Sequence, residues 1–458
     1  MVFNSAARSA GTTAPASSEP GDRVYRQVTR RLLPVMAACY FLSYLDRTNV
    51  SVAALDLKAD ASLGISDAVF GLGSGLFFIG YLVFEIPSNM AMHKFGARIW
   101  MTRIMVSWGV VACCQAFVAG PTSFYVIRIL LGVAEAGFFP GMLLYMTYWF
   151  TKAQRARIVA LFMAMVPLST ALGAPAGGLL LKLHGFLGLD GWRWLFIIEG
   201  VPTIVLGAFL FRLLTDRPQQ ATWLSDGDKK WLISTLEAEE ARTRSTFKYT
   251  VVQALTQPRI LLLSLVYFGL VTGLYGIGFW LPTIIKGKLS DDTFIITLYT
   301  ALPYVIGTVA IIWWGRVVDR TNEFVWRTAV PCGLGGLALV LTALLSKNPW
   351  VGYLGMCLCA IAVVMTFPGF WRLPSAFLSG WAAAAGLAMI NSLGNLSGWA
   401  APTLVGKIKQ ATGDPKWGLI AIGISMLVAA VIVIVLGAQP KDRRSGAVPA
   451  SVDRSPAE

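Results

Sequence analysis

Residues 419–436 read LIAIGISMLVAAVIVIVL, a run of eighteen residues without a charged side chain. As an α-helix rising 1.5 Å per residue, this run spans about 27 Å, close to the roughly 30 Å hydrocarbon thickness of a bilayer. A second long apolar run, Leu32–Leu55, lies near the other end of the chain. Over all 458 residues, 56% are apolar and only 14% are charged, where soluble domains carry about 25% charged residues. The sequence therefore predicts a helical membrane protein that crosses the bilayer many times.

Breaking the chain at charged residues and at Pro, Gly or Asn gives twelve apolar segments. They lie near residues 32–56, 68–90, 99–119, 122–147, 158–181, 194–214, 259–285, 293–315, 328–346, 350–371, 378–406 and 417–437. A long polar stretch divides them six and six. We expect an all-α membrane protein with a disordered tail at 1–24, six-helix bundles at 25–214 and 259–437, a linker at 215–258 and a second tail at 438–458.

The basic residues indicate the orientation of the chain. Of its 38 Lys and Arg residues, 26 fall in segments on the side of the N-terminus and nine on the other side. Because basic residues favour the cytoplasmic side, we expect both termini in the cytoplasm and the helices in the inner (plasma) membrane. The net charge of +14 then reflects topology and gives no reason to expect a nucleic-acid partner. The six cysteines lie in apolar runs and predict neither a disulfide framework nor a metal site.

A short basic turn follows the second apolar segment of each half. Residues 315–320 read GRVVDR, and residues 89–98, which read NMAMHKFGAR, occupy the same position six segments earlier. Gly315 would let helix ends approach, Asp319 would cap the next helix and Arg320 would meet a helix C-terminus. Two like-oriented halves of six helices are typical of secondary transporters built from parallel repeats.

Polar motifs interrupt several of the apolar segments. They are YLDRTNV at 44–50, GYLVFEIPSN at 80–89, RILLGVAEAGFFPG at 128–141, FWLP at 279–282 and a Gly- and Asn-rich stretch at 386–402. Over about residues 25–437, the chain resembles the anion:cation symporter family of the major facilitator superfamily. Within it, the chain is most similar to carriers of tartrate, phthalate, nicotinate and rhamnonate. The resemblance implies the major facilitator fold and import of an organic carboxylate together with protons.

Charged side chains at bilayer depth are costly and usually functional. Asp46 and Arg47 lie about 20 Å into the first segment, and adjacent side chains on a helix point about 100° apart. We expect Arg47 to face a central cavity and bind a substrate carboxylate with its planar fork, and Asp46 to carry the coupling proton. The alternative is a buried pair that only fixes the first helix.

Arg128 and Glu135 share one face of the fourth segment, about 10 Å apart along its axis. The resemblance gives Glu135 a second proton-coupling role and Arg128 a coupling or gating role. A helix-packing ion pair is the alternative for these two residues. We expect two further acidic residues, Glu85 and Glu199, to be structural.

Several polar and aromatic residues match positions that line the sugar-acid site in members of the family. They are Tyr44, Tyr81, Trp371 and Asn391, to which we add Asn395, and the alternative for each is ordinary packing. The chain is apolar at Met165 and Val166, where carriers of polyol acids have Gln, so a smaller hydroxy acid or an aromatic carboxylate is favoured. Arg372 is a candidate second carboxylate contact, or else it extends to the cytoplasmic face.

The sequence shows no nucleophile and base pair of the kind that an enzyme would need. We therefore expect a transporter without a cofactor or metal, in which the proton is the coupling ion and a monomer embedded in lipid binds a small organic anion. An exporter or anion exchanger on the same fold is the second reading, and a membrane-embedded receptor or enzyme is a distant third.

Overall fold

The computed structural model describes residues 19–244, 257–286, 288–321, 323–345, 347–375 and 380–438. Within these ranges the chain is helical, with short 3₁₀ turns and no β-strand beyond one isolated bridge. The helices are α1 (Glu19–Leu57), α2 (Asp67–Phe95), α3 (Ala97–Cys114), α4 (Pro121–Glu135), α5 (Phe138–Thr147), α6 (Lys152–Met163), α7 (Met165–Leu181), α8 (Gly191–Leu213), α9 (Asp226–Arg244), α11 (Pro258–Ile285), α12 (Thr293–Thr321), α13 (Val325–Leu345), α14 (Pro349–Phe370), α15 (Arg372–Ser375), α16 (Gly380–Asn395), α17 (Ser397–Thr412) and α18 (Lys416–Ala438).

The twelve expected segments correspond in order to helices of this structure. They are α1, α2, α3, α4 with α5, α6 with α7, α8, α11, α12, α13, α14, α16 with α17, and α18. Ten stretches among the described residues are long and apolar enough to cross a membrane. The other two are α1, whose hydropathy is lowered by Asp46 and Arg47, and α16 with α17, which are divided at Leu396. Part of the expected segment 378–406 lies outside the described residues. The predicted all-α membrane fold is confirmed.

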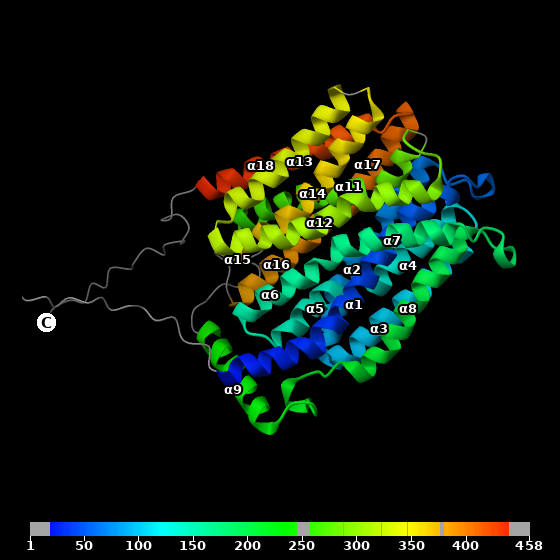
Figure 1. Cartoon of the computed structure of the whole chain (residues 1–458). Helices are drawn as coiled ribbons and strands as arrows, with labels where there is room; N and C mark the ends of the chain where they lie inside the picture. Colours follow the sequence, from blue (N-terminus) through cyan, green and yellow to red (C-terminus); the bar gives the residue numbers. More distant parts are fainter. Residues whose placement is uncertain are drawn as a thin grey trace, which may run out of the picture.

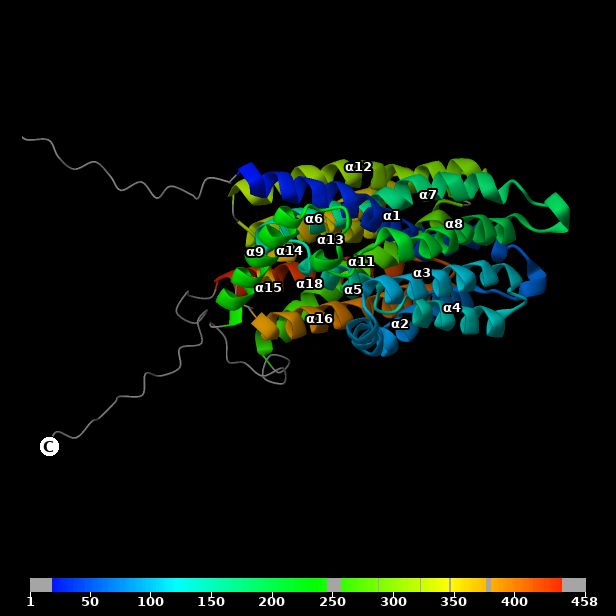
Figure 2. The same ribbon diagram turned by 90° about the horizontal axis from the view of Figure 1, so that it is seen from below.

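Helices α1–α8, the N-terminal half, gather on one side of the molecule, and helices α11–α18, the C-terminal half, on the other (Figure 1). The two halves meet where α2 packs against α17, α7 against α12 and α1 against α11. The long helices run along one shared direction, and α9 lies across one end of the bundle (Figures 1 and 2). We call this the α9 end, and the other the opposite end. A site between the halves therefore lies among helices that run along the same direction.

Helix α1 begins at Glu19, so the last six residues of the predicted disordered tail, 19–24, are helical. The reason is packing: Val24 is fully buried, and the ring of Tyr25 lies edge-on to Trp231 of α9 at 5.4 Å. Arg23 also pairs with Asp228 of α9 at 2.6 Å. The rest of the two predicted tails, 1–18 and 439–458, and the linker residues 245–256 lie outside the described residues.

The turn expected at 315–320 is part of α12, which continues to Thr321. Gly315 and Arg320 are therefore helical, and Asp319 does not cap the next helix as predicted. Glu323 takes that role, since its two carboxylate oxygens accept the backbone N–H groups of Trp326 and Arg327 at 2.9 and 3.1 Å. Because α12 is longer than expected, Asp319 lies on the side of the helix.

Candidate functional site

Arg47 and Glu135 form an ion pair in the interior of the bundle. Nη2 of Arg47 donates to Oε1 of Glu135, and the hydroxyl of Ser43 donates to the same oxygen at 2.8 Å. Nη1 of Arg47 donates to the hydroxyl of Tyr275 at 3.2 Å. Arg47 is 6% exposed and Glu135 is fully buried. Since Tyr275 belongs to α11, the guanidinium joins the two halves of the protein.

Aromatic rings surround the Arg47 guanidinium. Its central carbon lies 5.5 Å from the ring centre of Tyr44 and 5.2 Å from those of Phe77 and Tyr81. The hydroxyls of Tyr44 and Tyr275 are 3.3 Å apart. Ring faces attract a desolvated cation, so these rings help to hold Arg47 in one position. The structure thus brings together the predicted residues Tyr44, Arg47, Tyr81 and Glu135.

Asp46 points away from this cluster, into the N-terminal half between α1, α3 and α8. Its Oδ2 accepts hydrogen bonds from Nε1 of Trp108 at 2.9 Å and from the hydroxyl of Thr203 at 3.1 Å. Its Oδ1 accepts from Nδ2 of Asn49 at 3.4 Å. Asp46 is 1% exposed. The divergence of Asp46 and Arg47 agrees with their helical spacing, whereas these partners were not foreseen.

Arg128 is fully buried but does not pair with Glu135, so the predicted alternative of a packing ion pair between them does not hold. Its Nη1 donates to Oε1 of Gln115 and its Nη2 to the carbonyl oxygen of Ser74, both at 3.4 Å. Its guanidinium lies 5.2 Å from the ring of Phe77, the same ring that faces Arg47. One phenyl ring therefore contacts both buried guanidiniums.

Glu85, expected to be structural, connects the two halves. It is 2% exposed, and its oxygens accept hydrogen bonds from Nδ2 of Asn391 at 3.1 Å and from the hydroxyl of Ser392 at 2.8 Å. The predicted substrate residue Asn391 is thus held by a carboxylate of α2. Glu85 lies in the same motif, residues 80–89, as the predicted substrate residue Tyr81. This position could have marked Glu85 as a residue of the site.

Of the remaining predicted residues, Trp371 and Arg372 lie nearer the α9 end, where α14 ends and α15 begins, whereas Asn395 lies midway along α16 and α17. Trp371 packs edge-on against Tyr267 at 5.0 Å, and Asn395 is the half-buried last residue of α16. Arg372 pairs with Asp319 at the end of α12 and is partly exposed. The structure therefore does not bring Arg372 to the central cluster, and it supports the alternative in which this side chain extends to the membrane face.

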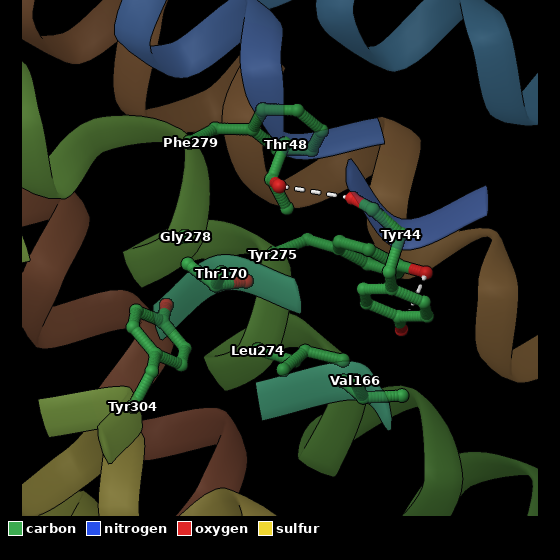
Figure 3. A pocket seen from close by; sticks show the side chains of 9 residues that line it. All are labelled: Tyr44, Thr48, Val166, Thr170, Leu274, Tyr275, Gly278, Phe279 and Tyr304. Atoms are coloured by element: carbon green, nitrogen blue, oxygen red, sulfur yellow. Dashed lines mark hydrogen bonds between the residues drawn. The ribbon is translucent and has the colours of Figure 1, made fainter. Parts of the chain in front are cut away.

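A small cavity adjoins the cluster, with room for about one water molecule. Figure 3 shows the side chains that line it and the hydroxyl contact between Tyr44 and Tyr275. The lining residues are Tyr44, Thr48, Val166, Thr170, Leu274, Tyr275, Gly278, Phe279 and Tyr304. They come from both halves, and apart from hydroxyl groups the lining is apolar. The cavity extends the Arg47 cluster toward α7 and α12.

The model of the Major Facilitator Superfamily matches residues 36–402. A protein of Agrobacterium vitis named "Putative tartrate transporter" is 43% identical over 90% of this chain and 91% of its own length. A quinolone resistance transporter of Acinetobacter baumannii is 38% identical over 93% of this chain and 97% of its own. Among solved structures, an inward-facing bacterial homologue of the human lysosomal transporter Spinster aligns with a TM-score of 0.68 at 17% identity, over 94% of this chain and 100% of that one.

Proposed function

Because this chain belongs to the major facilitator superfamily, and so is a membrane transporter and not an enzyme, we propose that it imports an organic carboxylate by symport with protons. A small hydroxy acid such as tartrate, or an aromatic carboxylate, is the proposed substrate. The observation that carries this proposal is the Arg47 guanidinium, buried at the junction of the halves and bound to the internal carboxylate of Glu135.

The Arg47 and Glu135 pair suggests how substrate and proton are coupled. An ionised Glu135 occupies the guanidinium fork that a substrate carboxylate would need. A proton on Glu135 would remove its charge and release Arg47 for the substrate. Carboxylate binding would then require a proton, and return of the empty carrier would require that Glu135 bind Arg47 again.

The residues around Arg47 would set the choice of substrate. Hydroxyls of Tyr44 and Tyr275 and the amide of Asn391 would bind oxygens of the ligand, with Tyr81, Trp371 and Asn395 as further contacts. The adjoining cavity presents apolar side chains such as Val166. Additional substrate hydroxyls placed there would lose hydrogen bonds made in water. A compact acid fits this lining better than a long polyol acid.

The opposite end of the bundle is closed by contacts between the halves, and we assign it to the outer side of the inner membrane, with both termini cytoplasmic. Asp67 of α2 pairs with Lys58 and, at 3.4 Å, with Lys409 of α17. Nζ of Lys286 donates to the carbonyl oxygen of Leu55 at 2.7 Å. The described state would then be closed to the outside, with Arg128 between this closure and the substrate site.

Proton coupling predicts that Asp46→Asn abolishes uphill uptake. In proteoliposomes, the wild-type protein should accumulate labelled tartrate, phthalate or nicotinate when the outside is acidic, and a protonophore should collapse the accumulation. The variant should lose accumulation because an amide cannot carry the proton. It should retain exchange of labelled for unlabelled substrate when the pH is equal on both sides of the membrane. Asp226→Asn, at an exposed position of α9, is the control. Full accumulation by Asp46→Asn would contradict the proton role.

Export or anion exchange is the second candidate function, favoured by the relative named for quinolone resistance. The same vesicles separate the candidates. Uptake that requires a counter-anion inside and does not respond to a pH gradient would favour exchange.

The stability of the protein should depend on pH through Lys58, which lies in the turn after α1. Burial lowers the pKa of Lys58 to about 8, although its partner Asp67 acts in the other direction and Lys409 adds to the lowering. The unfolded chain has a lysine pKa near 10.4. Between about pH 8 and 10 the folded protein therefore binds fewer protons, and its stability should rise with pH by up to about 3 kcal/mol.

This pH dependence can be measured as the melting temperature of the purified protein from pH 7.5 to 9.5. The wild-type protein should gain stability relative to Lys58→Met as the pH rises. Lys288→Met, at a half-exposed position of the same end, should follow the wild-type profile. If the profiles of wild type and Lys58→Met are parallel, burial does not lower the pKa of Lys58 in the folded protein.

A further inference from the structure

A second buried carboxyl, Glu199, lies beside Asp46 on the side facing the opposite end. It is the ninth residue of α8, which places it about 12 Å from the start of that helix, and it is 6% exposed. Asp46 stands eleven residues before the end of α1, about 16 Å from the same end. Glu199 is therefore the shallower of the two carboxyls when approached from the opposite end.

Asn49 joins these two carboxyls. Its Nδ2 donates to Oδ1 of Asp46 at 3.4 Å, and its side chain also faces the Glu199 carboxyl. Among the described residues, however, neither oxygen of Glu199 receives a well-formed hydrogen bond, and Oδ1 of Asn49 also lacks a donor. Three buried oxygen atoms, the two of the Glu199 carboxyl and Oδ1 of Asn49, thus have no hydrogen-bond donor.

No cation compensates the pair within the part of the chain that the structure describes. The groups that act on Glu199 are Asp46 and Asn49, and the α3 neighbour at this level of α8 is the thiol of Cys113, next to Gly200. Arg47, one residue from Asp46, is bound to Glu135 instead. Two uncompensated carboxylates in a dry interior would repel each other and lack solvation. The pair therefore retains a proton.

The hydrogen bonds indicate where that proton resides. Asp46 accepts from Trp108, Thr203 and Asn49, and three donors favour its ionised form. Glu199 has no such donors, so it is the better holder of a single proton. A protonated Glu199 also supplies one of the missing donors.

We propose that Glu199 shares the proton-binding site of Asp46: Glu199 and Asp46, linked through Asn49, hold a proton between them, apart from the proton assigned to Glu135. When the proton moves from the Glu199 carboxylic acid to Oδ1 of Asp46, Glu199 becomes the carboxylate. A hydronium ion that enters from the opposite end then protonates Glu199 and leaves a water molecule. This inference rests on the proposed proton coupling and adds a residue to it.

Glu199→Gln tests this role, because glutamine keeps the size and a donor but cannot exchange a proton. Gradient-driven uptake should fall at least 10-fold and its dependence on external pH should flatten, while exchange at equal pH stays within about twofold of wild type. Asp190→Asn, which removes a carboxylate just before α8, is the matched control. Unchanged uptake and pH profile in Glu199→Gln would overturn the proposal, as would equal losses of exchange and uptake.

A second measurement does not depend on transport. Infrared difference spectra of the purified protein between acidic and alkaline pH should contain a buried carboxylic acid band that disappears in Glu199→Gln and persists in Asp190→Asn. If the wild-type protein shows this band but no proton-driven uptake, then the proposed symport fails while the proton site stands. If the band is absent or survives in Glu199→Gln, the proton site fails.

Discussion

Arg47→Lys is expected to reduce carboxylate uptake about 100-fold while the protein remains folded. The Arg47 guanidinium uses two separate nitrogens, one for Glu135 and one for the hydroxyl of Tyr275 on the other half. A lysine ammonium is a point charge on a flexible stem and cannot reproduce this planar fork. A hydrogen bond that involves a charged group contributes about 1.5–3 kcal/mol, which corresponds to about 10- to 100-fold.

The same variant distinguishes loss of charge from loss of geometry. Lysine keeps the positive charge that Glu135 needs, so the melting temperature of Arg47→Lys should fall only slightly, whereas removal of the charge in Arg47→Met would leave Glu135 buried and unpaired. Arg103→Lys on α3, where the guanidinium lies 4.8 Å from the Trp100 ring, is the control and should transport normally. Wild-type affinity and rate in Arg47→Lys would mean that the substrate carboxylate binds elsewhere.

The buried charged residues of and around the site could be predicted because each stands out in an apolar segment. Asp46, Arg47, Arg128 and Glu135 were found in this way, since a charge at bilayer depth has few structural reasons to be there. Their pairing could not be predicted. Spacing along α4 left an ion pair between Arg128 and Glu135 open as the alternative, but the partner of Glu135 is Arg47 of α1. Only helix packing decides which of two cations reaches a carboxylate.

The uncharged partners carried no signal in the sequence. Trp108, Thr203 and Tyr275 lie in apolar segments where aromatic and hydroxyl residues are common, and they become part of the site only because α3, α8 and α11 pack against α1. Glu199 was expected to be structural for a related reason. Its distance from the helix start was clear, but its neighbour Asn49 was visible only in the packed structure.

Gly132→Ala should produce the largest loss of stability of any single methyl addition near the site. Helices α2 and α4 approach each other so closely that a Cβ at Gly132 would overlap the carbonyl oxygen of Phe77 and lie 2.9 Å from the backbone nitrogen of Tyr81. These are backbone atoms, so α2 must move to relieve the overlap. Overpacking of this kind costs about 1–3 kcal/mol, and movement of α2 would displace Tyr81 from the Arg47 guanidinium.

Gly352→Ala is the matched control, because a Cβ at Gly352 in α14 would meet no atom within 4 Å. There the change removes only the conformational freedom of glycine and should leave stability equal or about 0.5–1 kcal/mol higher. The melting temperatures of the two variants should therefore move in opposite directions, and uptake should fall in Gly132→Ala alone. Equal melting temperatures would show that α2 and α4 are not in close contact at Gly132, and normal uptake would show that the position of Tyr81 beside Arg47 is not needed for transport.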